Sequence, residues 1–231
     1  MPLPSSCLAI IPARGGSKGI PRKNVLPIYS LPLLAHSILA AKEAPEVGVI
    51  LVSSDDEEIR SIATQYGAQT IVRPSTLSGD TATSESALLH ALEMYAAQGN
   101  PDPEWIVFLQ ATSPLRFKGA ISKAIKKIEE EGADSLLSVN PTHGFLWRMT
   151  PGGPTSFNYD YRKRPRRQDI PCDYIENGSF YIMRPSILRA GNRLGGKIAV
   201  FEMSDWEGFQ IDTPAEFALL DTLMKTRPWE P

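Results

Sequence analysis

Short apolar runs alternate with amphipathic segments along the first 140 residues of the chain. Runs at 7–11, 47–52, 69–72, 105–109 and 135–139 have the length and apolar content of strands that are buried on both faces. Between them, apolar residues recur at helical spacing in 33–42, 57–66, 84–98 and 121–131. This alternation predicts an α/β fold with a mostly parallel sheet and helices on both of its faces.

The regular alternation ends at residue 140. From 140 to 176 the chain has no long apolar period, contains several prolines and includes the basic run Arg162-Lys-Arg-Pro-Arg-Arg167. Irregular segments of this length inside a compact domain are usually functional. Beyond it we expect a strand at 179–183, a short helix near 186–190, a strand at 198–201 and a helix at 214–225 that Thr213 caps. We therefore predict one domain over 1–231, with a core of 1–139 and 177–231 and an inserted arm at about 140–176.

Composition excludes several classes of protein. The 231 residues include 24 Lys plus Arg and 26 Asp plus Glu, and the formal net charge of −2 argues against a general nucleic-acid binder. The two cysteines are too few for a disulfide framework or a zinc cluster. The uncharged apolar stretch at 31–41 is too short to cross a membrane, and residues 1–6 do not resemble a signal peptide. We therefore expect a soluble cytoplasmic protein.

A basic loop with three glycines follows the first predicted strand, with the sequence Ala13-Arg-Gly-Gly-Ser-Lys-Gly-Ile-Pro-Arg-Lys-Asn24. Glycines let backbone N–H groups approach a phosphate closely, and cations such as Arg14, Lys18, Arg22 and Lys23 neutralise its charge. The loop has neither the GxxxxGK[ST] nor the GxGxxG spacing. Its position at the carboxyl end of a strand favours a phosphate-binding loop over a solvated basic turn.

This loop and a series of later segments together resemble the acylneuraminate cytidylyltransferases, also called CMP-sialic acid synthetases. The later segments are Arg73-Pro74, Asp80-Thr-Ala-Thr-Ser84, Gln110-Ala-Thr-Ser-Pro-Leu-Arg116, Arg167-Gln168, Asn177-Gly178 and Ile211-Asp-Thr213, in the order of that family. The resemblance implies a Rossmann-like nucleotide-diphospho-sugar transferase core with a protruding dimerisation arm. It also implies transfer of CMP from CTP to a nine-carbon 2-keto sugar acid, with Mg²⁺ and release of pyrophosphate.

The same resemblance assigns roles to individual residues. The nucleotide-binding residues would be Ala13, Arg14, Gly15, Ser17, Lys18, Lys23, Asn24, Arg73 and Ser84. The sugar-binding residues would be Gln110, Arg167, Asn177, Gly178 and Tyr181, with the Arg167 guanidinium on the sugar carboxylate. Lys23, Arg14 and Asp212 would form the catalytic set, in which Lys23 stabilises charge on the α-phosphate and Asp212 holds Mg²⁺. The arm would join two subunits in a homodimer and reach the partner's active site.

Simpler explanations exist for several of these residues. Arg73, Arg116 and the other cations of the run at 162–167 would merely be solvated, and 80–83 would only cap the third helix. Tyr181 is equally well explained as a core residue. The four aromatic residues of the arm, Phe145, Trp147, Tyr159 and Tyr161, suit either a subunit interface or a cover over the subunit's own core.

Two positions depart from the family pattern. Gln210 stands where many of these enzymes have an aspartate, which is expected to weaken the protein's own share of the metal site. Ile175 stands where some sialic acid enzymes have an arginine, which favours a less hydroxylated sugar. Legionaminic or pseudaminic acid is therefore expected at least as readily as N-acetylneuraminic acid. The alternatives are a CTP-dependent synthetase for the eight-carbon acid Kdo, a non-catalytic nucleotide- or sugar-binding paralogue and, more remotely, an RNA-binding module.

Overall fold

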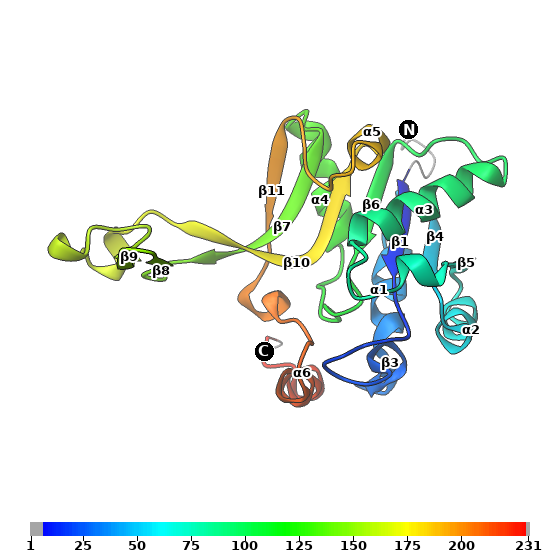
Figure 1. Cartoon of the computed structure of the whole chain (residues 1–231), viewed down its shortest axis with the longest axis horizontal. Helices are drawn as coiled ribbons and strands as arrows, with labels where there is room; N and C mark the ends of the chain where they lie inside the picture. The colour runs from blue at the N-terminus through cyan, green and yellow to red at the C-terminus, as the bar shows by residue number, and fades with distance from the viewer. Residues whose placement is uncertain (1–6, 230–231) are drawn as a thin grey trace.

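A computed structural model describes residues 7–229, so the expectation for residues 1–6 lies outside the described part of the chain. The body contains a seven-stranded sheet, and a long arm extends from it to the left in Figure 1. In spatial order the strands are β11 (Ile198–Glu202), β7 (Ser135–Thr142), β10 (Asp173–Met183), β6 (Trp105–Leu109), β1 (Cys7–Pro12), β4 (Val47–Ser54) and β5 (Gln69–Val72). Only β10 runs antiparallel to its neighbours, which confirms a mostly parallel sheet.

Helices cover both faces of the sheet, as predicted. Those on the sheet are α1 (Leu33–Lys42), α2 (Glu57–Gln65), α3 (Ser84–Ala97), α4 (Ala120–Glu130) and α5 (Pro185–Arg189), and α6 (Pro214–Thr226) lies beyond the sheet. Helices α1, α2 and α4 pack with the side chains of Ala9 and Ile11, whereas α3 and α5 pack with those of Leu8 and Ile10. Successive residues of β1 therefore face opposite layers, as the pleat of a strand requires. The described residues include no helix long and apolar enough to cross a membrane.

A third apolar cluster lies beyond the sheet and surrounds α6. Ile20, Ile28, Leu115 and Ile211 are buried there against Leu220. Ile28 belongs to a small hairpin of β2 (Pro27–Ile28) and β3 (Leu31–Pro32), which the sequence pattern did not predict because each strand has only two residues. Short 3₁₀ helices occupy other connections of the described chain: η1 (Lys23–Val25), η2 (Ser75–Leu77), η3 (Tyr161–Lys163), η4 (Arg167–Asp169) and η5 (Asp205–Gly208).

The arm is more regular than the sequence indicated. β7 continues to Thr142 and β10 begins at Asp173, so these strands run out of the body as an antiparallel pair. A hairpin of β8 (Trp147–Thr150) and β9 (Gly153–Ser156) lies farther out (Figure 1). The expected strand at 179–183 was thus too short, and the expectation of no regular structure at 140–176 was wrong. Because the strands of the arm have no buried face, they lack the apolar alternation by which strands are recognised.

A bulge marks the point where β10 leaves the body. The pairing of β10 with β7 shifts register between Glu176 and Tyr181, and Gly178 has a φ of +64° there. A left-handed conformation of this kind favours glycine. The Asn177 side chain holds the bulge, because its Oδ1 accepts hydrogen bonds from Ser138 Oγ at 2.6 Å and from the Ser179 N–H at 3.0 Å.

Candidate active site

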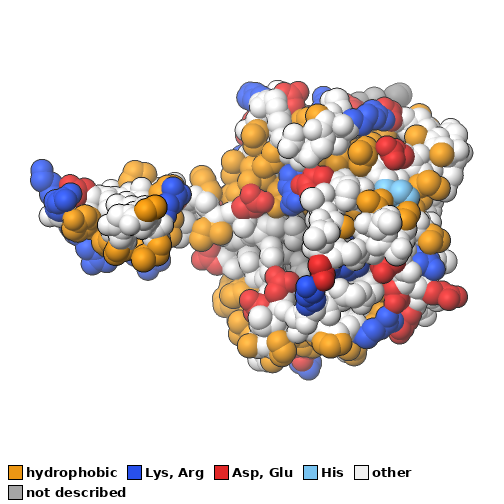
Figure 2. All heavy atoms as spheres, viewed as in Figure 1, with side chains coloured by type: hydrophobic (Ala, Val, Ile, Leu, Met, Phe, Trp, Pro, Cys, Tyr) orange, Lys and Arg blue, Asp and Glu red, His pale blue; other side chains and the backbone are white. Residues whose placement is uncertain are grey.

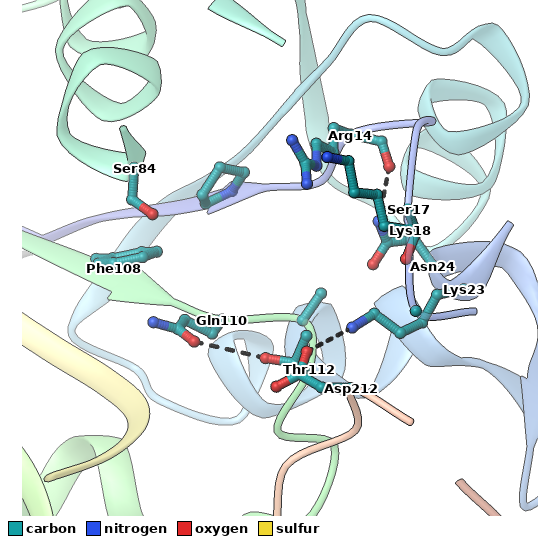
Figure 3. A pocket seen from close by; sticks show the side chains of 13 residues that line it. Arg14, Ser17, Lys18, Lys23, Asn24, Ser84, Phe108, Gln110, Thr112 and Asp212 are labelled. Carbon is teal, nitrogen blue, oxygen red and sulfur yellow. Dashed lines mark hydrogen bonds and ion pairs between the residues drawn. The ribbon is translucent and has the colours of Figure 1, made fainter. Parts of the chain in front are cut away.

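A cavity of about 430 Å³ opens at the carboxyl ends of β1 and β6 (Figure 3). Its walls come from the loop after β1, the first residue of α3, the segment that follows β6 and the residue that precedes the α6 cap. The side chains drawn in Figure 3 include Arg14, Ser17, Lys18, Lys23, Asn24, Ser84, Phe108, Gln110, Thr112 and Asp212. A smaller neighbouring cavity of about 300 Å³ shares Pro12, Arg14 and Ser84 and adds Arg73. The carboxyl edge of an open α/β sheet is the usual position for a ligand.

The backbone of the loop after β1 is shaped by contacts outside the cavity. Ala13 is buried and its N–H donates to the Ser53 carbonyl at 3.0 Å, while the Gly15 N–H donates to Asp55 Oδ1 at 3.1 Å. Gly19 passes close to the segment before α6, because a Cβ atom on Gly19 would lie 2.0 Å from the Asp212 carbonyl oxygen. Ala13 and Gly15 therefore shape the loop, and neither lines the cavity.

Arg22 differs from the other three cations of this loop. Its guanidinium forms ion pairs with Asp56 and Glu58, at the start of α2, and its backbone is left-handed with a φ of +60°. The expectation that all four cations face a phosphate was therefore wrong for Arg22. Only Arg14, Lys18 and Lys23 line the cavity.

The three remaining cations each contact a carboxylate. Lys18 Nζ lies 2.7 Å from Asp80 Oδ2, and Arg14 Nη1 lies 3.4 Å from Asp80 Oδ1. The hydrogen bond from Lys18 lowers the pKa of Asp80. Lys23 is buried, and its Nζ donates to the Ile211 carbonyl at 2.5 Å and to Asp212 Oδ1 at 2.9 Å. A polyanion that entered the cavity would compete with these carboxylates for the same cations.

Arg73 is only 6% exposed, so its explanation as a solvated arginine is wrong. Its Nε donates to Ser78 Oγ at 3.1 Å, and its Nη2 lies 3.8 Å from Asp55 Oδ1. Burial lowers the pKa of Arg73, and the negative charge of Asp55 partly offsets this decrease. The helix-cap explanation of 80–83 accounts for Thr83, whose Oγ1 accepts from the Ser86 N–H at 3.2 Å, but not for Asp80.

The residues predicted to bind the sugar do not all lie together. The Gln110 side chain lies at the cavity beside Thr112 (Figure 3), and a Cβ atom on Gly178 would lie 3.2 Å from Gln110 Oε1. Tyr181 is 1% exposed, stacks on Phe108 at 5.4 Å between ring centroids and donates its hydroxyl to Glu176, so its environment is that of a core residue. Arg167 lies in η4 of the arm, outside this cavity.

The Asn177 side chain is occupied within the protein. Besides the two bonds accepted by its Oδ1, its Nδ2 donates to Asn140 Oδ1 at 2.9 Å. Gln210 donates from its Nε2 to the Asn177 carbonyl. Both amides therefore hold the bulge at the base of the arm beside the cavity.

Sequence analysis did not single out Phe108 as a cavity residue. It belongs to the apolar run of β6, and nothing in that pattern distinguishes a cavity wall from a core position. The simpler explanation of Arg116 as a solvated residue was also wrong, because its Nη2 donates to the Gln110 carbonyl at 2.8 Å and its Nε is shielded from solvent. The sequence signal for a role of Arg116 was its place at the end of the segment Gln110-Ala-Thr-Ser-Pro-Leu-Arg116, which was already expected at the site.

A mostly parallel sheet with a cation-lined cavity at its carboxyl edge defines an α/β protein with a ligand site at the ends of its strands. The chain belongs to the cytidylyltransferase family, whose model, described as "Cytidylyltransferase", matches residues 8–228. The family to which the sequence motifs pointed is thereby confirmed.

Named relatives and a solved structure agree with this assignment. An N-acylneuraminate cytidylyltransferase B of Danio rerio is 34% identical over 217 residues, which are 92% of this chain and 50% of the relative. A pseudaminic acid cytidylyltransferase of Campylobacter jejuni is 35% identical over 178 residues, which are 75% of this chain and 76% of the relative. A CMP:2-keto-3-deoxy-manno-octonic acid synthetase complexed with CTP shares the fold, with a TM-score of 0.70, 17% identity and coverage of 96% and 99% of the two chains. The chain spans about half the length of the N-acylneuraminate relative.

Proposed function

We propose that this protein transfers CMP from CTP to the anomeric hydroxyl of a nonulosonic acid and releases pyrophosphate. The observation that carries the proposal is the placement of three loop cations in one cavity with Gln110. The names of the relatives from Danio rerio and Campylobacter jejuni support a sialic-type acid as the acceptor. Kdo is the alternative acceptor, because the fold is also that of a Kdo-activating enzyme.

The two adjoining cavities suit the two parts of CTP. The smaller one has apolar walls from Pro12, Leu77 and Ala87 and includes the buried Arg73, which fits a flat base with polar edges. The triphosphate would then lie along Arg14, Lys18 and Lys23 in the larger cavity. Ser84 borders both cavities and would contact the nucleotide between its base and its phosphates.

In the proposed reaction the C2 hydroxyl oxygen of the sugar acid attacks the α-phosphorus. The new oxygen–phosphorus bond forms as the bond from the α-phosphorus to the bridging oxygen breaks, pyrophosphate leaves with that electron pair, and the hydroxyl proton is released to solvent. Phosphoryl-type transfer depends mainly on positioning and on neutralising charge. Lys23 suits the second task because it is buried and is already held by the Ile211 carbonyl and Asp212.

Asp212 would hold Mg²⁺ together with the nucleotide. It is the carboxylate among the residues that line the larger cavity, and the described residues include no group of three or more His, Cys, Asp and Glu that could hold a metal on their own. Mg²⁺ commonly binds one or two carboxylates and completes its shell with substrate phosphates and water, so these residues fit it. When bound, the ion supplies positive charge to the phosphates. The Gln210 amide is directed to the Asn177 carbonyl.

The arm supports the proposal of a homodimer. Large apolar side chains are exposed along it, namely Leu146, Trp147, Met149, Phe157 and Tyr161, and Figure 2 shows hydrophobic side chains along the arm with basic ones at its outer end. Exposed apolar patches of this kind are typical of interaction surfaces. A second copy that packed on the arm would bring Arg167 of one subunit toward the cavity of the other, where it would bind the sugar carboxylate.

The test is pyrophosphate release from CTP and Mg²⁺ with N-acetylneuraminic, legionaminic, pseudaminic and Kdo acids in parallel. We expect release with a nine-carbon acid and a preference for legionaminic or pseudaminic acid, because Ile175 is apolar and exposed at the base of the arm. A clear preference for N-acetylneuraminic acid would contradict the role given to Ile175. CTP binding without release for any acid would instead support the non-catalytic paralogue.

The Lys23→Ala variant tests the mechanism in the same assay. We expect turnover to fall by about 100-fold or more, as when a charge-stabilising donor is removed from other active sites. Lys42→Ala is the matched control, because Lys42 lies on α1 and its Nζ donates to the Tyr66 carbonyl at 3.2 Å. Equal activity of the two variants would exclude the proposed role of Lys23.

A further inference from the structure

Arg116 holds an unusual position directly behind the cavity. Its Nη1 donates to Ser37 Oγ at 2.9 Å, and its Nη2 donates to the Gln110 carbonyl at 2.8 Å and to the Ser179 carbonyl at 2.6 Å. Its Nε is shielded from solvent and has no hydrogen-bond partner among the described residues. The guanidinium is therefore held by three neutral oxygen atoms, while the residue as a whole is half-buried and also borders a surface hollow with Leu115 and Phe117.

Two of these oxygen atoms belong to residues in or next to neighbouring strands, at the side of the cavity where Gln110 lies. Gln110 directly follows β6, and Ser179 lies in the bulge of β10 beside Gly178. The Gln110 N–H donates to the same Ser179 carbonyl at 3.2 Å, and Ser37 Oγ also donates to the Gln110 carbonyl at 3.3 Å. Arg116 thus joins the end of β6 to the bulge within β10 through one guanidinium group, which fixes the backbone from which the Gln110 side chain projects.

The charge of Arg116 is not neutralised by a direct ion pair among the described residues. Glu207 is the carboxylate whose charge acts on it, but Glu207 accepts its hydrogen bonds from the Phe117 and Ser204 N–H groups. Burial lowers the pKa of Arg116 to about 9, so the group stays protonated at neutral pH. Removing a cation from water and placing it among neutral partners costs free energy. This cation lies beside the cavity in which an anionic substrate would bind.

We propose that Arg116 is a positioning residue for the acidic sugar: it holds Gln110 and the Asn177–Ser179 bulge in register and adds positive potential behind them. The inference rests on the proposed function. The nucleotide side of the site has supports of its own, because Arg14, Lys18 and Lys23 come from the loop after β1 and, within the described chain, no hydrogen bond joins any of them directly to Arg116. The link is indirect: Lys23 donates to the Ile211 carbonyl, and the Ile211 N–H donates to the Thr112 carbonyl at 2.8 Å. Loss of Arg116 is therefore expected to act on the sugar acid more than on CTP.

The experiment compares Arg116→Lys and Arg116→Gln with wild type and with Arg189→Gln, a control at an exposed arginine that pairs with Asp102. For both Arg116 variants we expect the KM for the sugar acid to rise by about tenfold or more, the cost of removing a charged hydrogen-bonding group. The KM for CTP, and the Kd for CTP measured by calorimetry without sugar, are expected to change by less than about threefold. Lysine keeps the charge but cannot reach three acceptors, so Arg116→Lys should be impaired less than Arg116→Gln.

Ser37→Ala provides a second, milder variant. It removes one hydrogen-bond acceptor of Arg116 from a buried position on α1. We expect it to raise the KM for the sugar acid by a smaller factor than Arg116→Gln does. Equal increases of both KM values, or an unchanged sugar KM in Arg116→Gln, would overturn the inference and leave a purely structural arginine. Wild-type protein that binds CTP but uses none of the acids would instead refute the proposed function, and the inference with it.

Discussion

Asp80 is the residue that links the loop after β1 to the loop before α3. Its carboxylate contacts both Arg14 and Lys18, and the Gly79 carbonyl accepts a further hydrogen bond from Arg14 at 3.1 Å. These are the cations expected to meet the triphosphate. The single negative charge of Asp80 therefore pairs with the same cations that a nucleotide would use.

We predict that Asp80→Asn binds CTP more tightly than wild type. Triphosphate must displace the carboxylate, and the pairs are solvent-exposed, so the expected gain is small, about threefold in Kd at low salt. Titration calorimetry at low and high ionic strength measures it, and the gain should shrink as salt screens the pairs. Asp102→Asn serves as the control, since Asp102 pairs with Arg189 on a distant surface. Weaker CTP binding by Asp80→Asn would show that Asp80 assists the nucleotide instead of competing with it.

At the scale of the elements, capped helix starts hold the segments that flank the cavity. Asp56 caps α2, because its Oδ1 accepts from the Ile59 N–H at 3.0 Å, and the same carboxylate pairs with Arg22. Thr213 and Glu216 form a capping box at the start of α6, directly after Asp212. Each cap satisfies backbone N–H groups that have no partner within the helix. The α2 cap thereby anchors the loop at 13–24 through Arg22, and the α6 cap fixes the position of Asp212.

The Asp56 carboxylate makes stability depend on pH. The hydrogen bond from Arg22 lowers the pKa of Asp56 below its ordinary value of 3.8. Because the pKa of Asp56 is lower in the folded state, its ion pair contributes fully to the free energy of unfolding at pH values above the ordinary pKa. This contribution is lost as the pH falls through the lowered pKa of the folded state. We predict that Asp56→Asn, which keeps a capping oxygen, has a lower free energy of unfolding than wild type at pH 6, and that the difference narrows below about pH 4.

Urea unfolding at several pH values measures this difference. Asp205→Asn, at an exposed position in η5, is the matched control for removing one negative charge. A difference that stayed constant down to pH 3, or widened there, would contradict the assigned ion pair between Asp56 and Arg22.

At the scale of the whole molecule, the arm separates Arg167 from the cavity of its own chain. Arg167 borders a different surface hollow, with His143, Phe145 and Arg164, in the outer part of the arm. The rings of Phe145, Tyr159, Trp147 and Tyr161 contact one another in series there. Such a rigid aromatic surface on an extended hairpin suits contact with a second copy.

We predict that mixing two inactive variants, Lys23→Ala and Arg167→Ala, restores activity if the arms cross between subunits. A mixed dimer would contain one site with both residues intact, so random exchange in a two-fold dimer should recover about a quarter of the wild-type rate. Sedimentation velocity would establish the dimer, and pyrophosphate release after mixing and refolding would measure the recovery. Absence of recovery from verified mixed dimers would place Arg167 and Lys23 in the same subunit's site, and full activity of Arg167→Ala alone would assign Arg167 no role.

Local sequence determined the helices, the buried strands of the core and the family of this protein. Helix α1 was predicted over the residues it occupies and the other five to within one residue at either end, since apolar periodicity and end signals act over a few residues. The basic loop after β1 was also recognisable, because its composition and its place behind a buried strand are both local features.

Only the tertiary structure decided which side chains face the cavity. Arg22 turns to α2, Tyr181 is buried against Phe108, and Arg116 lies behind Gln110, although each belongs to or adjoins a segment that pointed to the site. For Arg22 and Arg116 these directions depend on partners 34 to 79 residues away in the chain: Asp56 for Arg22, and Ser37 and the Ser179 carbonyl for Arg116. No local pattern encodes them, because they follow from how the strands pair and where a bulge redirects β10.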